Sequence, residues 1–280
     1  MAGISLSDSV FRSPLSATVF RSPDAVRAGL VTRSGLRRAG YQRLYRGIWA
    51  GPDLEVTYGL RMIALDRHVL PPDCVFGGRS AADLLGVPAG TWDDIDIVTS
   101  RRFGPIHGVH VHLGAPPPDE VHTSPEGLAY TSVGRTCRDI ALWFPLTESV
   151  PLLDALIRAD VASLTDLEQY ALHHEPDRGW KKLLTATEYC DSGARTQFES
   201  RVRVTLMIHG LPRPFAGLFD DLPLSWPEES VGVVLPGTAV DAFDSSWILH
   251  EITEDRLRVD AAGFAEEVKG SLRRRGRRVS

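Results

Sequence analysis

The 280-residue chain is poor in cysteine, and this scarcity excludes two common ways of stabilising a fold. Its three cysteines, Cys74, Cys137 and Cys190, are far apart and include no pair at the spacing of zinc ligands. An odd, dispersed set is not typical of a disulfide framework or a structural zinc site. We therefore expect three reduced thiols that pack as small apolar side chains.

Long apolar runs are missing as well. No segment approaches the roughly 20 apolar residues of a membrane helix, and residues 1–10 lack the basic start and continuous apolar stretch of a secretory signal. Hydrophobic residues still make up 43% of the chain, which is enough for ordinary globular cores. The length allows about two domains. The sequence thus predicts a cytoplasmic globular protein that does not contact a membrane.

Acidic residues are almost absent from one segment near the N-terminus. Residues 12–46 contain eight arginines and a single acid, Asp24, although the whole chain has a formal net charge of −5. Residues 269–280 form a second basic segment with six lysines and arginines and no acid. The chain between them is strongly acidic. We expect a polyanion such as DNA to be attracted to the ends and repelled by the middle.

The first 55 residues have the pattern of two short helices followed by a β-hairpin. Residues 22–24, Ser-Pro-Asp, are a typical helix start, and Thr32 is placed to cap a second helix that Gly40 would end. Residues 44–50 alternate and turn as a small hairpin does. This order predicts a winged helix, whose second helix lies in a DNA groove. The alternative is a solvated arginine-rich helical hairpin that binds nothing.

The candidate DNA contacts are on the expected second helix and on the hairpin. Arginines on the exposed side of the helix would face the major groove or its walls, and arginines on the hairpin would contact phosphates or the minor groove. Hydroxyl groups at the helix start are plausible phosphate contacts. The candidates are Thr32, Arg33, Ser34, Arg37, Arg38, Arg43 and Arg46.

Residues 56–185 are predicted to form a mixed α+β module. Apolar residues recur at helical or strand spacing over short stretches. The expected helices are 58–70, 80–86, 133–144 and 148–159, and the expected strands are 95–98 and 109–113.

Two histidines in the second expected strand suggest a metal site. His110 and His112 would point to the same face of that strand. The sequence places no carboxylate or cysteine beside them, and an isolated histidine pair is more often a half-exposed strand face. No metal site is therefore predicted.

Three segments together resemble a large actinobacterial group of proteins. The first is Thr32–Trp49, which ends in Leu-Tyr-Arg-Gly-Ile-Trp; the second combines Gly78–Gly86 with Val133–Ala141; the third is Phe198–Arg203 followed by Gly210–Pro214. In that group the N-terminal part is the winged helix of AbiEi-type antitoxins, and the C-terminal part is related to very-short-patch-repair endonucleases. The resemblance implies an α+β fold.

The resemblance divides that fold into three parts. They are an N-terminal winged helix-turn-helix over residues 1–55, a mixed α/β antitoxin-like middle module over 56–185, and a restriction-endonuclease-like α/β domain over 186–280.

The same resemblance implies that this last domain has lost its chemistry. Nuclease members need several carboxylates around a divalent metal ion that activates water. Glu199 matches the acid supplied by a helix, but the strand positions that should carry the other acids are Pro223, Val234 and Pro236. No catalytic residue is therefore assigned. Glu199 would instead favour the helix dipole or pair with Arg203.

The sequence leaves two main functional hypotheses open. The first is a DNA-binding transcriptional regulator that resembles AbiEi antitoxins of type IV toxin–antitoxin systems, without cofactor or catalysis. The alternative is a Mg²⁺-dependent DNA endonuclease with a displaced acid set that includes Glu199 and Asp221.

The expected partners follow from the first hypothesis. They are double-stranded DNA, a cognate toxin protein that binds the acidic middle, and a second copy of the chain. The tail, residues 268–278, is expected to be helical, and its arginines are either a second phosphate-facing patch or a frayed soluble end.

Overall fold

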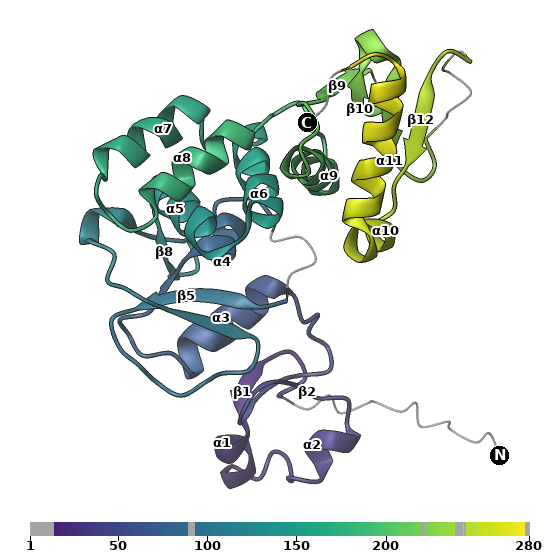
Figure 1. Ribbon diagram of the computed structural model, residues 1–280. Helices are drawn as coiled ribbons and strands as arrows, with labels where there is room; N and C mark the ends of the chain where they lie inside the picture. Colours follow the sequence, from purple (N-terminus) through teal and green to yellow (C-terminus); the bar gives the residue numbers. More distant parts are fainter. Residues whose placement is uncertain (1–13, 89–92, 220–221, 239–242, 244, 278–280) are drawn as a thin grey trace, which may run out of the picture. The chain divides into compact units, whose positions relative to one another are not determined.

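The computed structural model describes residues 14–88, 93–219, 222–238, 243 and 245–277 (Figure 1). The chain divides into two compact units. The first comprises residues 1–75, 93–115 and 123–129, and the second comprises 76–92, 116–122 and 130–280. Both contain helices and strands, which confirms the expected α+β fold. The three-part division at residues 55 and 185 stays a prediction.

The first unit begins with a module of three short strands and two short helices. Its strands are mutually antiparallel in the order β1-β3-β2. A small core of Leu15, Phe20, Ala25 and Leu36 holds the module together. Its elements are β1 (Val19–Arg21), α1 (Ser22–Arg27), α2 (Gly35–Arg38), β2 (Gln42–Tyr45) and β3 (Ile48–Ala50). The hairpin expected after the second helix is therefore present.

The helices of this module are shorter than the sequence indicates. Residues 33–34 form a turn, so α2 has only four residues, although the Thr32 hydroxyl accepts the Gly35 N–H at 2.9 Å as a cap would. Ser22 is the first residue of α1 rather than its cap, and no side chain caps that helix. Strand β1 was not expected, because three residues with one buried side chain, Phe20, are too few for an alternation signal.

The rest of the first unit consists of a helix and a parallel strand pair. These elements are α3 (Tyr58–His68), β5 (Ile95–Thr99) and β6 (Val109–Leu113). The Thr57 side chain caps α3 by accepting the Leu60 N–H. The buried Tyr45 on the hairpin donates its hydroxyl to the Arg61 carbonyl oxygen at 3.1 Å, which fixes the hairpin against α3.

The second unit begins with a group of helices around an apolar core. The helices are α4 (Gly78–Leu84), α5 (Val133–Trp143), α6 (Leu146–Arg158), α7 (Leu164–His173) and α8 (Trp180–Tyr189). Short strands precede α5, namely β4 (Val75–Phe76), β7 (Val121–Thr123) and β8 (Ala129–Thr131), and β4 pairs with β8 in parallel through Phe76 and Tyr130.

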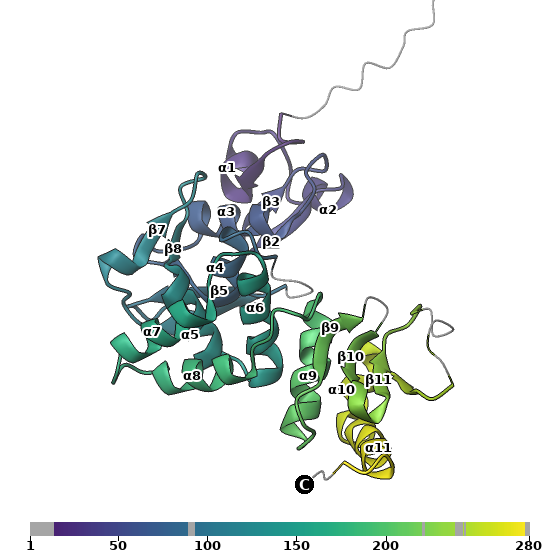
Figure 2. The ribbon, with the colours of Figure 1, turned by 90° about the horizontal axis from the view of Figure 1, so that it is seen from above.

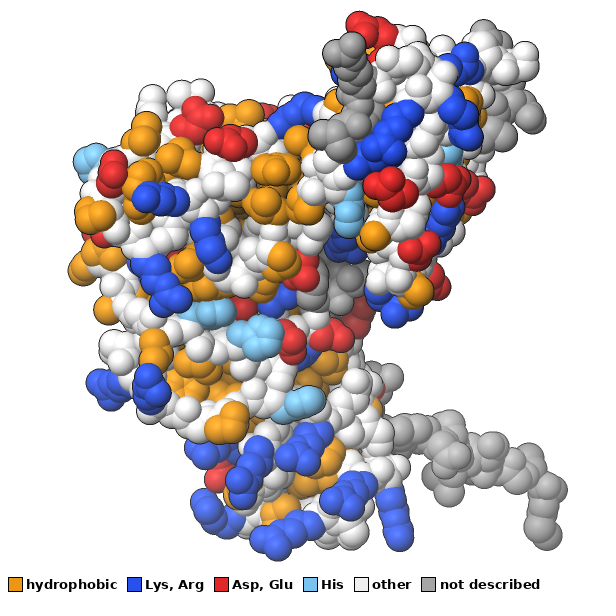
Figure 3. Space-filling view, in the orientation of Figure 1, with side chains coloured by type: hydrophobic (Ala, Val, Ile, Leu, Met, Phe, Trp, Pro, Cys, Tyr) orange, Lys and Arg blue, Asp and Glu red, His pale blue; other side chains and the backbone are white. Residues whose placement is uncertain are grey.

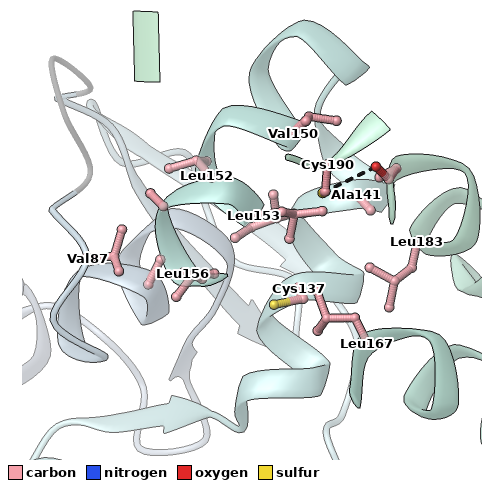
Figure 4. Close-up of a cluster of buried hydrophobic side chains, with 14 of the residues drawn as sticks. Val87, Cys137, Ala141, Val150, Leu152, Leu153, Leu156, Leu167, Leu183 and Cys190 are labelled. Atoms are coloured by element: carbon pink, nitrogen blue, oxygen red, sulfur yellow. Dashed lines mark hydrogen bonds between the residues drawn. The ribbon is translucent and has the colours of Figure 1, made fainter. Parts of the chain in front are cut away.

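The core of these helices is apolar and contains two of the cysteines. Figure 4 shows Leu153, Leu156, Leu167 and Leu183 converging around Cys137. Burial raises the pKa of the Cys137 thiol to about 12. All three cysteines are free and buried, so the expectation of apolar thiol roles is confirmed.

The C-terminal part of the second unit is a four-stranded mixed sheet with helices. Strand order is β12-β11-β10-β9, with β12 parallel to β11 and the other pairs antiparallel. Helices α9 and α11 contact this sheet and each other (Figure 2). The elements are α9 (Gln197–Ile208), β9 (Phe215–Phe219), β10 (Leu222–Trp226), β11 (Val231–Val234), β12 (Ile248–Glu251), α10 (Glu254–Val259) and α11 (Ala261–Arg274).

A buried ion pair joins α6 to α9 inside the second unit. The Arg203 guanidinium lies 2.7 Å from the Asp154 carboxylate, and both side chains are 0% exposed. The pairing of Arg203 with Glu199 that the helical spacing suggested is therefore wrong. In the part of the chain that the structure describes, no helix has the length and apolar character needed to cross a bilayer.

Candidate nucleic-acid interface

Seven arginines of the N-terminal basic segment are exposed on the first module, and we call them the front arginine patch. Figure 3 shows Lys and Arg side chains gathered over the elements α1 and α2. Their chemistry is that of a surface that attracts anions. The members are Arg21, Arg27, Arg33, Arg37, Arg38, Arg43 and Arg46.

Most of these guanidinium groups have no partner among the described residues. Arg27 lies 3.5 Å from Asp24 in an exposed ion pair, and the Arg43 Nε donates to the Tyr45 carbonyl oxygen at 3.3 Å. The other five form no ion pair or side-chain hydrogen bond with any described residue. Their donors are therefore available to an anion from outside.

The patch is held by ordered elements. Leu36 is 3% exposed and fills the small core, while its neighbours Arg37 and Arg38 are exposed. Gly47 has a φ of 80°, the left-handed conformation that lets the chain turn between β2 and β3. Charges on a packed helix and a hairpin keep their spacing when a ligand approaches.

The short α2 changes the role expected for the second helix. At about 1.5 Å of rise per residue, four residues span only about 6 Å. A recognition helix that reads several base edges must be longer. Arg33 and Ser34 lie in the preceding turn rather than on a helix. The geometry therefore favours contacts to phosphates over base reading by this helix.

The two hydroxyl candidates already have partners. The Thr32 hydroxyl accepts the Gly35 N–H and lies 3.3 Å from the Ser34 hydroxyl. Both side chains are exposed but occupied with local contacts. Phosphate contacts from a helix N-terminus are thus not supported, because a single helical turn provides little dipole.

Positive charge from the front arginine patch is also felt at the end of α3. Burial lowers the pKa of His68, and the charges of Arg21 and Arg67 lower it further. A lowered pKa is the effect that nearby positive charges have on a histidine. The field of the front arginine patch therefore reaches beyond residues 12–46.

The basic C-terminal tail has the opposite character. The Arg277 guanidinium lies 2.8 Å from the Glu229 carboxylate, and the Arg274 guanidinium donates to the Ser271 hydroxyl at 2.8 Å. Arg275 donates to the Ser246 carbonyl oxygen, and Arg273 lies 4.0 Å from Glu266. Each of these four described tail arginines therefore has a partner in its own unit, and whether they also contact phosphates stays a prediction.

Glu199 has a structural role in the second unit. Its carboxylate accepts the Arg195 N–H at 2.7 Å, and its own N–H donates to the Thr196 hydroxyl at 3.1 Å. These contacts stabilise the start of α9 in the manner of a capping box. The side chain is buried, with 6% of its residue surface exposed.

The remaining acids give the nuclease alternative no support. Glu228 and Glu229 face Arg277, and Asp221 lies outside the described residues. Pro223 and Val234 lie on β10 and β11. Among the described histidine, cysteine and acidic side chains, no group of three is arranged to hold a metal ion.

The histidine pair on β6 has a carboxylate partner that sequence reasoning missed. The His112 Nε2 lies 3.1 Å from the Asp96 Oδ1, and the His110 Nδ1 lies 3.5 Å from the same oxygen. Parallel pairing places Asp96 on β5 directly opposite His110. The statement that no carboxylate lies beside these histidines is therefore wrong, because register between strands is not visible in the sequence.

Comparisons with known proteins add little. No protein-family model matches the chain, and no curated protein matches it. The crystal structure of the RV2827C protein from Mycobacterium tuberculosis is similar over 61% of this chain and 71% of that chain, with 20% sequence identity and a TM-score of 0.41. The resemblance to AbiEi-type antitoxins and to very-short-patch-repair endonucleases stays a prediction.

Proposed function

We propose that this chain is a non-catalytic DNA-binding protein whose front arginine patch contacts the phosphates of duplex DNA. The observation that carries the proposal is the set of exposed guanidinium groups without partners in the described chain. Seven like charges on so small a module repel one another. A polyanion that lies across them removes this repulsion and releases its own counterions, so both changes favour binding.

The role of the bound protein rests on the sequence resemblance. An AbiEi-type antitoxin would act in the cytoplasm as a transcriptional regulator, and a pair of copies would place two patches on one duplex. The acidic middle of the chain would then bind a basic protein such as a cognate toxin. A pull-down with the product of the adjacent gene tests this partner.

The DNA proposal is tested by removing two unpartnered arginines. Arg37→Ala with Arg38→Ala is expected to weaken binding to any duplex. It should also make the dependence of log K on log salt shallower by about 0.9 per lost phosphate contact. The measurement is a gel shift or fluorescence anisotropy over a salt series.

The matched control removes two arginines from the tail. Arg273→Ala with Arg274→Ala changes the net charge equally but removes groups that have local partners. We expect DNA binding of this control to stay near that of the parent chain. Unchanged binding in the Arg37 and Arg38 variant, or an equal loss in the control, contradicts the proposal.

A further inference from the structure

A groove of about 720 Å³ lies beside the hairpin within the first unit. One wall is the hairpin around its turn, and the other is the end of α3 together with the segment that leads into β6. The lining includes Arg43, Arg46, Val69, Pro105, Ile106 and His107.

The groove combines cationic and apolar surface. Arg46 and His107 are exposed and have no ion pair or side-chain hydrogen bond with a described residue. Arg43 uses its Nε in the hairpin, which leaves its two terminal nitrogens for a ligand. Val69, Pro105 and Ile106 provide the apolar part of the lining. A DNA strand presents the same mixture, because anionic phosphates alternate with the apolar faces of deoxyribose rings.

The charged side chains that line the groove are arginines. Arg101 is 3.3 Å from Asp73, so it contributes little. Arg67, two residues before Val69, is exposed. Two arginines and a histidine line the groove without an acid among the lining residues, and Asp94 lies beside Gly108, the residue that follows His107.

We propose that this groove holds a stretch of DNA sugar–phosphate backbone, so that the DNA-contacting surface continues from the hairpin to Pro105–His107. The inference rests on the proposed function. It adds the segment Pro105–His107 to the surface that is proposed to contact DNA. It assigns a binding role to Ile106 and His107, which lie outside the basic segment. The segment between β5 and β6 then fixes the orientation of the duplex on the hairpin, as backbone contacts do in other DNA-binding proteins.

Opposite charges placed in the groove test the inference. Ile106→Glu introduces a carboxylate beside the expected phosphates, and Ile106→Lys introduces a cation at the same position. We expect the first to weaken binding to duplex DNA and the second to strengthen it, each by about threefold to tenfold, the size of one phosphate contact. Fluorescence anisotropy with a labelled duplex gives the affinity, and a thermal melt checks that each variant is folded.

Leu113 provides the control for long-range electrostatics. It is 52% exposed on β6 in the same unit and does not line the groove. Leu113→Glu and Leu113→Lys should change affinity much less than the Ile106 pair. Equal effects at both positions overturn the inference. If Ile106→Glu does not fold, His107→Glu tests the same point at an exposed side chain.

Two further results separate this inference from the proposed function. If the Ile106 variants bind DNA like the parent while Arg37→Ala with Arg38→Ala loses binding, the groove proposal fails and the DNA-binding proposal stands. If neither set changes binding, both fail. Inorganic phosphate at millimolar concentration should compete weakly. Complete competition would show a small-anion site and overturn the backbone assignment.

Discussion

The two basic segments look alike in the sequence and differ in the structure. Five front arginines have no partner among the described residues, whereas Arg273, Arg274, Arg275 and Arg277 each contact an acceptor in their own unit. Two tail arginines are paired with acids: Arg273 with Glu266, which is close in the sequence, and Arg277 with Glu229, which is distant. Local charge density therefore does not show which charges are free, because folding brings in the neutralising groups.

The difference has an energetic meaning. Glu229 is 9% exposed, and Arg277 compensates a carboxylate that is largely removed from water. To bind a phosphate, Arg277 would have to leave that carboxylate unpaired, which is unfavourable. The five front arginines without a partner among the described residues lose no such contact on binding. The tail arginines are expected to stabilise the fold, and the front arginines are expected to bind.

The largest expected effect comes from an arginine that is fully internal. Arg203→Met leaves the Asp154 carboxylate buried without its ion pair, which should lower the free energy of unfolding by about 3–5 kcal/mol. Urea denaturation measures the loss. Asp154→Leu combined with Arg203→Met should recover part of it, because an apolar pair leaves no uncompensated charge. A loss below about 1 kcal/mol would show that water reaches this pair.

A smaller effect is expected for the tail. Arg277→Ala should lower the free energy of unfolding by about 1–3 kcal/mol, because Glu229 loses a hydrogen bond in a poorly hydrated place. Arg273→Ala removes only an exposed contact of 4.0 Å to Glu266 and should change stability by less than about 0.5 kcal/mol. Neither variant should change DNA affinity. A loss of binding in Arg277→Ala as large as that of a front variant would break the distinction between the two segments.

Patterns inside one element could be predicted from the sequence. The apolar repeats predicted helices at 133–144 and 148–159, and the structure has α5 and α6 there. The hairpin was predicted at 44–50 from its alternation and its turn, and the structure has it at 42–50 with Gly47 in the turn. These signals depend on neighbours a few residues apart, so tertiary context does not alter them.

Contacts between distant segments could not be predicted. The pairing of Arg203 with Asp154 replaces the local pairing with Glu199 because α6 packs on α9. The contact of Asp96 with His110 depends on strand register. The seven DNA-binding candidates could be placed near one another from the sequence, yet the groove wall at Ile106 could not, since it comes from a segment about sixty residues further along the chain.

The smallest expected effect comes from the acid of the front module. Asp24→Asn removes an exposed ion pair with Arg27 and one negative charge, so stability should fall by less than about 1 kcal/mol. DNA binding should become tighter, with a salt dependence steeper by up to about 0.9, because Arg27 is released to contact a phosphate.

Glu266→Gln is the matched change in the tail, where it releases Lys269 and Arg273 from their acid. If the front patch alone binds DNA, this variant leaves the affinity unchanged while Asp24→Asn raises it. An equal gain in both variants would mean that the tail is a second DNA-binding surface whose cations are blocked by pairing with Glu266. Both segments would then bind DNA, and they would differ only in how strongly local acids compete with the DNA.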